Sequence, residues 1–281
     1  MQTLRPALNF AVIGDSAAHG VGDLESNGLE KGWAGYLSRN FLDHYRYENF
    51  SRPGAKSIEV LDVQLPQALE IEPDICAVIV GGNDLLRNGF DPHLLYQNLR
   101  QTCRALALAG SEILMVELHD PNQLLRLPKL LKRVLRRRVN AVNQVYQKIE
   151  TEFECVLIRT REIPDVHDLV NWHVDRMHPG PRGHQLLARE MATQLCKRGW
   201  QINLPEIKSF PRQSSTERWR WMLVKGTPWF LKRSVDLLPA MIFLMLCEFV
   251  SLTTSSFKGH IQRLRLARET RRSALSRSQS H

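Results

Sequence analysis

Short apolar runs that alternate with helical patterns constrain the fold of this chain more than any other feature. Five runs have the composition of β-strands, and they cover residues 8–13, 47–50, 75–80, 112–118 and 155–159. Four of them are nearly continuous in apolar residues, which is typical of strands covered on both faces. Because helical patterns separate the runs, the sequence predicts an α/β fold with a parallel sheet and helices on both sides.

The helical patterns between these runs show which segments should cover the sheet. Apolar residues recur at helical spacing through residues 129–150, which predicts the longest helix of the chain. A last helix is expected over residues 183–197. The alternation ends near Trp200, so we expect one α/β domain over residues 1–200 and a helical extension over 201–281, with its last part disordered.

The two parts differ in charge. The chain has 281 residues and a formal net charge of +9, yet residues 1–200 hold as many acidic as basic side chains. The whole excess of positive charge therefore lies in residues 201–281. Such asymmetry suggests contact with a polyanion, for example a membrane surface or a nucleic acid.

The extension has features that permit two interpretations. Trp219, Trp221 and Trp229 lie among basic residues and precede an apolar stretch, a composition typical of an interfacial helix. Alternatively, the segment forms helices that dock on the α/β domain, with the tryptophans in the core. A peripheral contact with an anionic membrane surface through residues 205–281 is thus one hypothesis. The arginines of residues 263–277 could also bind a nucleic acid, but this signal is generic and we favour the membrane over a nucleic acid.

Cysteine usage bears on location and on metal chemistry. The five cysteines are scattered among apolar residues and no pair has CxxC spacing, which indicates buried free thiols in a reducing compartment. The first residues lack the features of a signal peptide, and the apolar run 237–247 is too short to span a bilayer. We therefore expect a cytoplasmic protein, with peripheral attachment to a membrane as the alternative.

No cofactor and no metal are expected. His167, Asp168 and His173 lie close together in the sequence, but no further ligand follows at a regular spacing. His119 and Asp120 end the fourth apolar run and are candidates for binding a substrate.

The first segment that carries chemistry follows the first apolar run. Ser16 lies in Gly14-Asp15-Ser16, so it falls at the carboxyl end of a predicted strand, where open α/β sheets bind their ligands. At the start of a helix, backbone N–H groups favour developing negative charge. Ser16 is therefore a candidate nucleophile, and the alternative is that it only caps a helix.

Two more segments fall at the same edge of the predicted sheet. Asn83 lies in Gly81-Gly82-Asn83-Asp84 after the third run, where its amide can donate to an oxyanion or close a turn. Asp175 precedes His178 by three residues, before the last helix. A neutral imidazole can take a proton from a serine hydroxyl, and a carboxylate that folds back can orient the ring. Jointly, these residues predict nucleophilic catalysis.

These segments resemble the SGNH (GDSL) hydrolase family over about residues 8–198. Residues 14–22, with the sequence GDSAAHGVG, match its first block, GDSxxxGxG, although the fourth residue is Ala17 in place of leucine. Residues 81–84 match its GxND block, and residues 175–178 match its DxxH block. Gly54 fits the weakly defined second block. The resemblance implies a flavodoxin-like three-layer α/β/α sandwich with a five-stranded parallel sheet.

The resemblance also implies roles for these residues. Ser16 would be the nucleophile, His178 the general base and Asp175 its orienting partner. The oxyanion hole would consist of the backbone N–H groups of Ser16 and Gly54 and the side-chain amide of Asn83. Asp15 and Asp84 are expected to serve only structural hydrogen bonds.

The expected function is a serine hydrolase that cleaves carboxylic esters of small molecules or lipids, that is, an esterase or lipase. One alternative is an acyltransferase that uses the same triad. Another is a non-catalytic module that binds a membrane surface.

The basic run of residues 126–138 permits two interpretations as well. It follows the fourth strand, so its start lies near the active-site edge and could recruit anionic lipid or an acidic substrate. The alternative, which the sequence favours, is the solvated face of an amphipathic helix.

Overall fold

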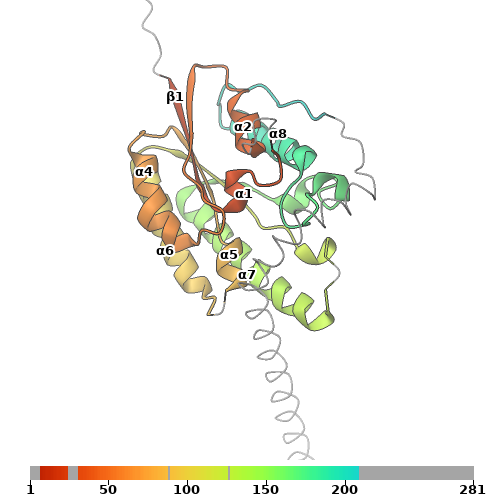
Figure 1. Ribbon diagram of the computed structural model, residues 1–281. Coiled ribbons are helices and arrows are strands. Elements are labelled where there is room, and N and C mark those ends of the chain that lie inside the picture. The colour runs from red at the N-terminus through yellow and green to blue at the C-terminus, as the bar shows by residue number, and fades with distance from the viewer. Residues whose placement is uncertain (1–6, 25–30, 88, 126, 209–281) are drawn as a thin grey trace, which may run out of the picture.

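A five-stranded parallel sheet forms the centre of the fold in the computed structural model, which describes residues 7–24, 31–87, 89–125 and 127–208 (Figure 1). The strand order is β2-β1-β3-β4-β5, and every neighbouring pair is parallel. The strands are β1 (Leu8–Gly14), β2 (Tyr45–Asn49), β3 (Ile75–Ile79), β4 (Glu112–Val116) and β5 (Val156–Ile158). The predicted α/β fold with a parallel sheet is confirmed.

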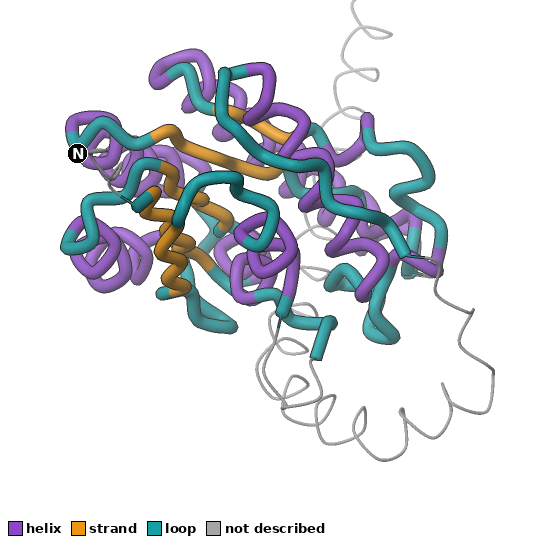
Figure 2. Tube along the Cα trace, turned by 90° about the horizontal axis from the view of Figure 1, so that it is seen from above, coloured by secondary structure: helices purple, strands orange, loops and turns teal. Residues whose placement is uncertain are grey.

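Helices cover the sheet on both sides, as Figure 2 shows. The α-helices are α1 (Ser16–His19), α2 (Gly32–Ser38), α3 (Ser57–Glu59), α4 (Leu65–Leu69), α5 (Gly82–Leu86), α6 (Pro92–Leu108), α7 (Lys129–Phe153) and α8 (Pro181–Lys197). A π-helical segment, η1 (Val60–Gln64), joins α3 to α4, and short 3-10 helices are η2 (Pro121–Gln123), η3 (Thr160–Glu162) and η4 (Leu169–Asn171).

Alternating side chains of the strands divide the core into two layers. On β1, Phe10 and Val12 are buried on the side of α2 and α8, whereas Ala11 and Ile13 are buried on the side of α4, α6 and α7. This alternation follows from the two-residue period of a strand. Because both sides are covered, β3 is apolar throughout, and β1 and β4 are apolar except for Asn9 and Glu112, which is why the sequence pattern identified them.

Strand ends differ from the predicted boundaries where tertiary contacts intervene. The fourth run was expected to extend to Leu118, but β4 ends at Val116. The side chain of Asn143, on α7, donates to the carbonyl of Leu118 and accepts from its N–H, both at 2.9 Å. These backbone groups are therefore bonded to a helix side chain in place of a neighbouring strand, which ends the ladder.

The cysteine expectation is only partly correct. Cys76, Cys103 and Cys155 are buried free thiols, but Cys196 is exposed because it lies on the last turn of α8, facing away from the sheet. Cys247 and almost all of the expected extension, from residue 209 on, lie outside the described residues, as do the tryptophans, the apolar run and the arginines discussed above. Within the described part of the chain, no helix is both long and apolar enough to cross a membrane.

A buried histidine of α8 links α2 to the loop that follows α1. His184, on α8, is fully buried, accepts from Trp33 N–H at Nδ1 (3.2 Å) and lies 3.2 Å from the carbonyl of Val21 at Nε2. Since Nδ1 faces a donor, the ring is held as the neutral Nε2–H tautomer. Burial lowers the pKa of His184 from 6.5 to about 4.

We expect this histidine to make folding stability depend on pH. Between about pH 6.5 and pH 4, His184 is protonated in the unfolded chain but stays neutral in the folded chain. The contribution of His184 to the free energy of unfolding is therefore complete above pH 6.5 and is lost as the pH falls toward 4. The loss amounts to about 3 kcal/mol. Urea unfolding across this range should show a shallower pH dependence for His184→Gln than for the wild type. Equal slopes would contradict the buried neutral state.

Candidate active site

Ser16 lies at the carboxyl end of β1, as the first residue of α1. The residue that caps this helix is Asp15, whose Oδ1 accepts from Ala17 N–H at 3.0 Å. Because Asp15 satisfies the capping position, the hydroxyl of Ser16 remains available for another partner. The alternative in which Ser16 serves as the cap is therefore wrong.

The turn that presents Ser16 depends on Gly14. Its φ of +145° and the carbonyl of Ile79, which would lie 1.9 Å from an added Cβ, exclude any larger residue there. The buried side chain of Gln64, in the π-helical segment, accepts from Gly14 N–H at 2.6 Å and donates to its carbonyl at 3.0 Å. Gln64 therefore fixes the backbone two residues before Ser16, a role that no local sequence signal indicated.

The structure brings Ser16, His178 and Asp175 into one hydrogen-bonded chain. His178 Nε2 lies 2.7 Å from Ser16 Oγ, and His178 Nδ1 lies 2.8 Å from Asp175 Oδ2. The side chains of His178 and Asp175 are 13% and 5% exposed, so little water reaches the pair. The carboxylate fixes the ring with Nδ1 protonated, which leaves Nε2 able to accept the hydroxyl proton.

The loop that carries this pair folds back on itself. Asp175 Oδ1 accepts from the backbone N–H groups of Met177 and His178, at 2.9 and 3.1 Å. Arg176 between them has a φ of +55°, a left-handed conformation that costs a non-glycine residue free energy and that the surrounding bonds maintain. The three-residue spacing of aspartate and histidine is thus sufficient for one carboxylate to bind both backbone and ring.

A second histidine contacts the same carboxylate. His173 Nδ1 lies 3.2 Å from Asp175 Oδ2. Burial by itself would raise the pKa of Asp175, but the hydrogen bonds from His173 and His178 outweigh it and hold the pKa well below the usual range. From the sequence, His173 is only a poorly supported candidate for a metal site. Within the described ranges, no group of three or more potential ligands could hold a metal ion.

The candidate oxyanion donors lie on neighbouring loops. Asn83, in α5, donates to the carbonyl of Ala55 at 3.1 Å, and because an amide nitrogen carries two hydrogens, one remains for another acceptor. Gly54, with a φ of +92°, precedes Ala55 in a turn whose closing bond runs from Ala55 N–H to Arg52. No heavy atom lies within 4 Å of the Cβ position of Gly54, so the backbone there is accessible.

Asp84 and Asp15 hold these loops in place. Asp84 Oδ1 accepts from the hydroxyl of Ser57 at 2.6 Å, which ties the start of α3 to α5. Burial raises the pKa of Asp15 to about 6, against the opposing effects of its backbone hydrogen bonds and of nearby His178. Neither carboxylate has a described hydrogen bond to the imidazole of His178, whose Nδ1 is bonded to Asp175.

His119 lies at the same edge, after β4. Its ring packs on Trp172, with centroids 4.0 Å apart, and its Nε2 is buried without a hydrogen-bond partner among the described residues. Burial lowers the pKa of His119 to about 3, so the ring is neutral near pH 7. An unpaired buried nitrogen at this place can bond a polar group of a bound molecule.

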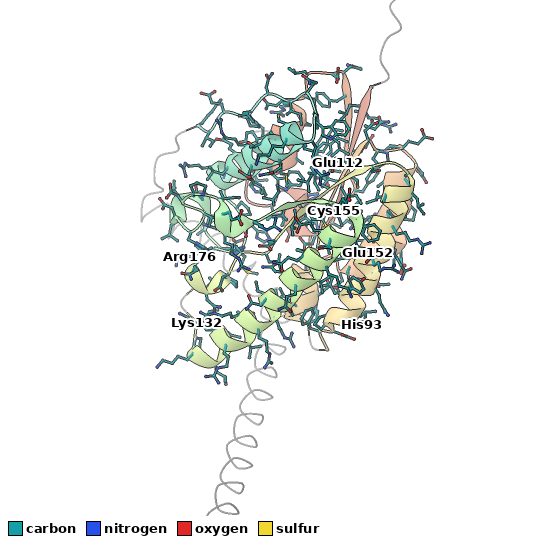
Figure 3. All side chains as sticks on the ribbon, turned by 180° about the vertical axis from the view of Figure 1, so that it is seen from behind. His93, Glu112, Lys132, Glu152, Cys155 and Arg176 are labelled. Carbon is teal, nitrogen blue, oxygen red and sulfur yellow. The ribbon has the colours of Figure 1, made fainter. Side chains whose placement is uncertain are left out.

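The start of α7 is connected to this site. Arg176, on the loop between Asp175 and His178, donates to the carbonyl of Leu124 at 3.1 Å, just before α7. Arg138, on α7, donates to the carbonyls of Leu85 and Arg87 at the end of α5, at 2.5 and 2.9 Å. Figure 3 shows Arg176 on the side of the molecule where the first turns of α7, with Lys132, project.

One family of known proteins matches the greater part of the chain. The profile of the GDSL-like Lipase/Acylhydrolase family matches residues 12–186, which include Ser16, Gly54, Asn83, Asp175 and His178. No curated protein matches the chain.

Several solved structures share the fold. A crystal structure of TesA is 24% identical with a TM-score of 0.52, over 66% of this chain and 97% of that one. A putative GDSL-like lipase from Parabacteroides merdae is 15% identical with a TM-score of 0.58, over 68% and 96%. The psychrotrophic esterase EstA from Pseudoalteromonas sp. is 19% identical with a TM-score of 0.53, over 68% and 97%.

Proposed function

Because the chain belongs to the GDSL-like lipase/acylhydrolase family, whose members hydrolyse esters, we propose that it cleaves carboxylic esters with Ser16 as nucleophile, His178 as general base and Asp175 as orienting acid. One observation carries the proposal. Ser16 Oγ, the imidazole of His178 and the carboxylate of Asp175 form a continuous chain of contacts at 2.7 and 2.8 Å. That geometry is what a serine needs to become a nucleophile near neutral pH.

The proposed reaction proceeds by acyl transfer in two halves. Ser16 Oγ attacks the ester carbonyl carbon while its proton moves to His178 Nε2, giving a tetrahedral oxyanion. The intermediate collapses, the C–O bond to the alcohol breaks, and His178 returns the proton to the leaving alcohol. A water molecule then gives its proton to His178 and attacks the acyl-serine, which releases the acid and restores the hydroxyl of Ser16.

The negative charge that develops on the carbonyl oxygen needs hydrogen-bond donors. We assign this role to the backbone N–H groups of Ser16 and Gly54 and to the amide of Asn83. The bond from Asn83 to Ala55 supports the assignment, because it fixes the amide and links it to the loop of Gly54. Donors that are already oriented stabilise the transition state without rearrangement during the reaction.

We expect Asn83→Ala to lower kcat for p-nitrophenyl butyrate by about 10²–10³-fold with little change in KM, because the lost bond forms mainly in the transition state. Steady-state kinetics of the purified variant measure the effect. The substitution also removes the hydrogen bond from Asn83 to the carbonyl of Ala55, and thermal unfolding of the same sample measures the effect of that loss on stability. A rise in KM with kcat unchanged would place Asn83 in substrate binding and contradict the oxyanion assignment.

The proposed function is tested with a series of p-nitrophenyl esters from acetate to long acyl chains. Hydrolysis that requires Ser16 is the expected result, and the chain-length profile separates an esterase for short acyl groups from a lipase. Adding an acceptor alcohol to the same assay tests acyl transfer, because an acyltransferase would release p-nitrophenol faster and form the new ester. The absence of turnover with every ester would contradict the proposal.

A further inference from the structure

Six side chains lie along one face of the first half of α7, and we name them the α7 basic surface. They enclose a shallow hollow of about 510 Å³, and they are Lys129, Lys132, Arg133, Arg136, Arg137 and Asn140. Their spacing of three and four residues places them in a single stripe of the helix. No acidic side chain lines the hollow in the described part of the chain.

The stripe faces away from the domain. The opposite face of the same turns is buried in the core, through Leu131, Val134, Leu135 and Val139. All members of the α7 basic surface except the half-buried Lys132 are exposed. An ordinary solvated helix face mixes both signs of charge, whereas this face carries only positive charge.

This charge pattern opposes the stability of the helix. Lys129 and Arg133, and again Arg133 and Arg137, are like charges four residues apart, which repel each other. The first turn of α7 contains no acidic residue, so cations lie at the end of the helix where the backbone dipole is positive. The approach of Asp120 Oδ2 to Arg136 Nε, at 3.7 Å near the surface, offsets little of this repulsion.

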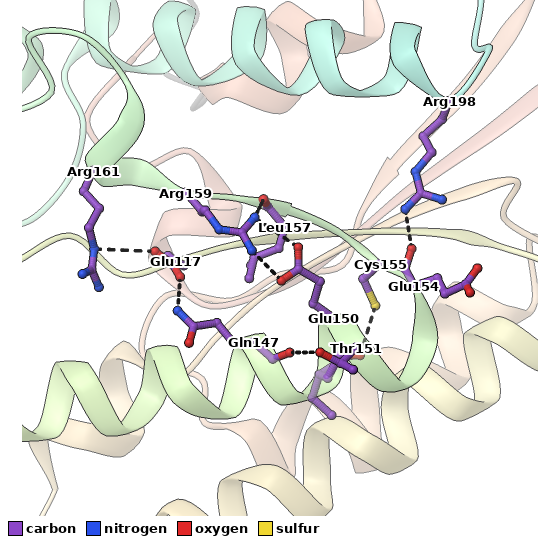
Figure 4. Close-up of polar contacts among 11 residues, drawn as sticks. Glu117, Gln147, Glu150, Thr151, Glu154, Cys155, Leu157, Arg159, Arg161 and Arg198 are labelled. Carbon is purple, nitrogen blue, oxygen red and sulfur yellow. Dashed lines mark hydrogen bonds and ion pairs between the residues drawn. The ribbon is translucent and has the colours of Figure 1, made fainter.

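The other end of α7 has the reverse pattern. Its acidic residues Glu150 and Glu152 lie near the carboxyl end, where the dipole disfavours them, but each has a cationic partner. Glu150 pairs with Arg159 at 2.8 Å, as Figure 4 shows, and Glu152 pairs with Arg100. Charge at that end is therefore paired within the domain, whereas the side chains of the α7 basic surface are all cationic or neutral, so this surface attracts an anion.

We propose that the α7 basic surface is a docking site for an anionic lipid bilayer. A bilayer presents many phosphate groups in a plane, and that plane matches a straight stripe of cations along a surface helix. Lys and Arg near such a surface each strengthen binding by roughly fivefold. The surface contains no aromatic side chain on which nucleic-acid bases could stack, which favours lipid over a single-stranded nucleic acid.

The position of the surface relates docking to catalysis. The turns of α7 that carry it follow Leu124, which accepts from Arg176 of the catalytic loop, and precede Arg138, which holds the end of α5. A bilayer bound there would lie beside the edge of the sheet that carries Ser16. This consequence rests on the proposed function and points to lipid esters as substrates, but binding itself does not depend on turnover.

The experiment is cosedimentation of the full-length chain with phosphatidylcholine vesicles that contain or lack phosphatidylglycerol. The test variant carries Lys129→Gln, Arg133→Gln, Arg136→Gln and Arg137→Gln. We expect its partition onto phosphatidylglycerol vesicles to fall by roughly 600-fold, which is the fivefold effect of each of the four cations taken together, and wild-type binding to weaken as salt is added. Because the substitutions relieve repulsion within α7, we also expect the variant to unfold at the same or a higher temperature.

A matched control has four cations removed at the opposite edge of the sheet. It carries Arg104→Gln, Lys148→Gln, Lys197→Gln and Arg198→Gln, at exposed positions on or next to α6, α7 and α8. It should bind phosphatidylglycerol vesicles within a few-fold of the wild type. Both variants should hydrolyse a water-soluble ester as the wild type does.

Equal loss in both variants, or no loss in the α7 variant, would overturn the proposal. So would loss of binding to duplex DNA in the α7 variant with vesicle binding unchanged, because the surface would then serve a nucleic acid. Ser16→Ala distinguishes the two proposals, since it should bind vesicles as the wild type does. Vesicle binding without any ester hydrolysis by the wild type would contradict the proposed function alone.

Discussion

Purified Ser16→Ala is expected to hydrolyse p-nitrophenyl esters at least about 10⁴-fold more slowly than the wild type, because no other group can form the acyl intermediate. The Oγ atom contacts His178 Nε2 at 2.7 Å, and alanine removes only this atom. Ser16 is the first residue of α1, and the cap of that helix is provided by Asp15, so the helix remains capped. The variant should therefore unfold at nearly the wild-type temperature, which separates loss of chemistry from loss of fold.

Ser38→Ala is a suitable control for this measurement. Ser38 is a buried serine of α2 whose hydroxyl donates to the carbonyl of Gly35 in its own helix at 3.4 Å. We expect its turnover to equal that of the wild type. Undiminished ester hydrolysis by Ser16→Ala would remove the serine from the mechanism.

Replacing Asp175 by asparagine should be nearly as damaging, with kcat lowered by about 10⁴-fold. The carboxylate accepts from His178 Nδ1 at 2.8 Å and keeps the proton on that nitrogen. An amide in its place can donate to Nδ1, which moves the ring proton to Nε2 and directs a donor at Ser16. The serine then has no base, although the geometry is nearly unchanged. Steady-state kinetics with p-nitrophenyl butyrate measure the loss.

The matched control for this substitution is Asp168→Asn. Asp168 caps the η4 turn through its bond from Val170 N–H at 3.3 Å, and asparagine caps such turns equally well. We expect its kcat to remain within about twofold of the wild type. If Asp175→Asn had only a small effect and Asp15→Asn lost activity instead, the orienting carboxylate would be that of Asp15 and our assignment would be wrong.

Much of the site could be predicted because its signals are local. The carboxyl ends of parallel strands lie at one edge of a sheet. The residues after the first apolar run, those after the third run and those before the last helix are therefore all expected at that edge. The structure places Ser16 and Asn83 at that edge, and the three-residue spacing of Asp175 and His178 permits the observed contact. The capping residue was not predictable in the same way, since both Asp15 and Ser16 can cap a helix.

Contacts between distant segments could not be predicted. Gln64 lies fifty residues from Gly14, and Asp84 lies twenty-seven residues from Ser57, yet both side chains fix the loops around the site. Neither residue stands out in its own segment, because its role depends on where another segment passes. His173 is similar: the sequence predicted no metal site and no other role for it, and only the fold shows that it contacts the carboxylate of Asp175.

The sequence by itself determined the class of fold, the order of its elements and the residue types at the functional edge, because apolar periodicity and motif spacing act over short stretches of chain. The tertiary structure alone decided which donors hold each loop, which histidine pairs with which carboxylate, and which way the cations of α7 face. These depend on distances between segments that the sequence separates widely, and such distances are set only when the layers pack on the sheet.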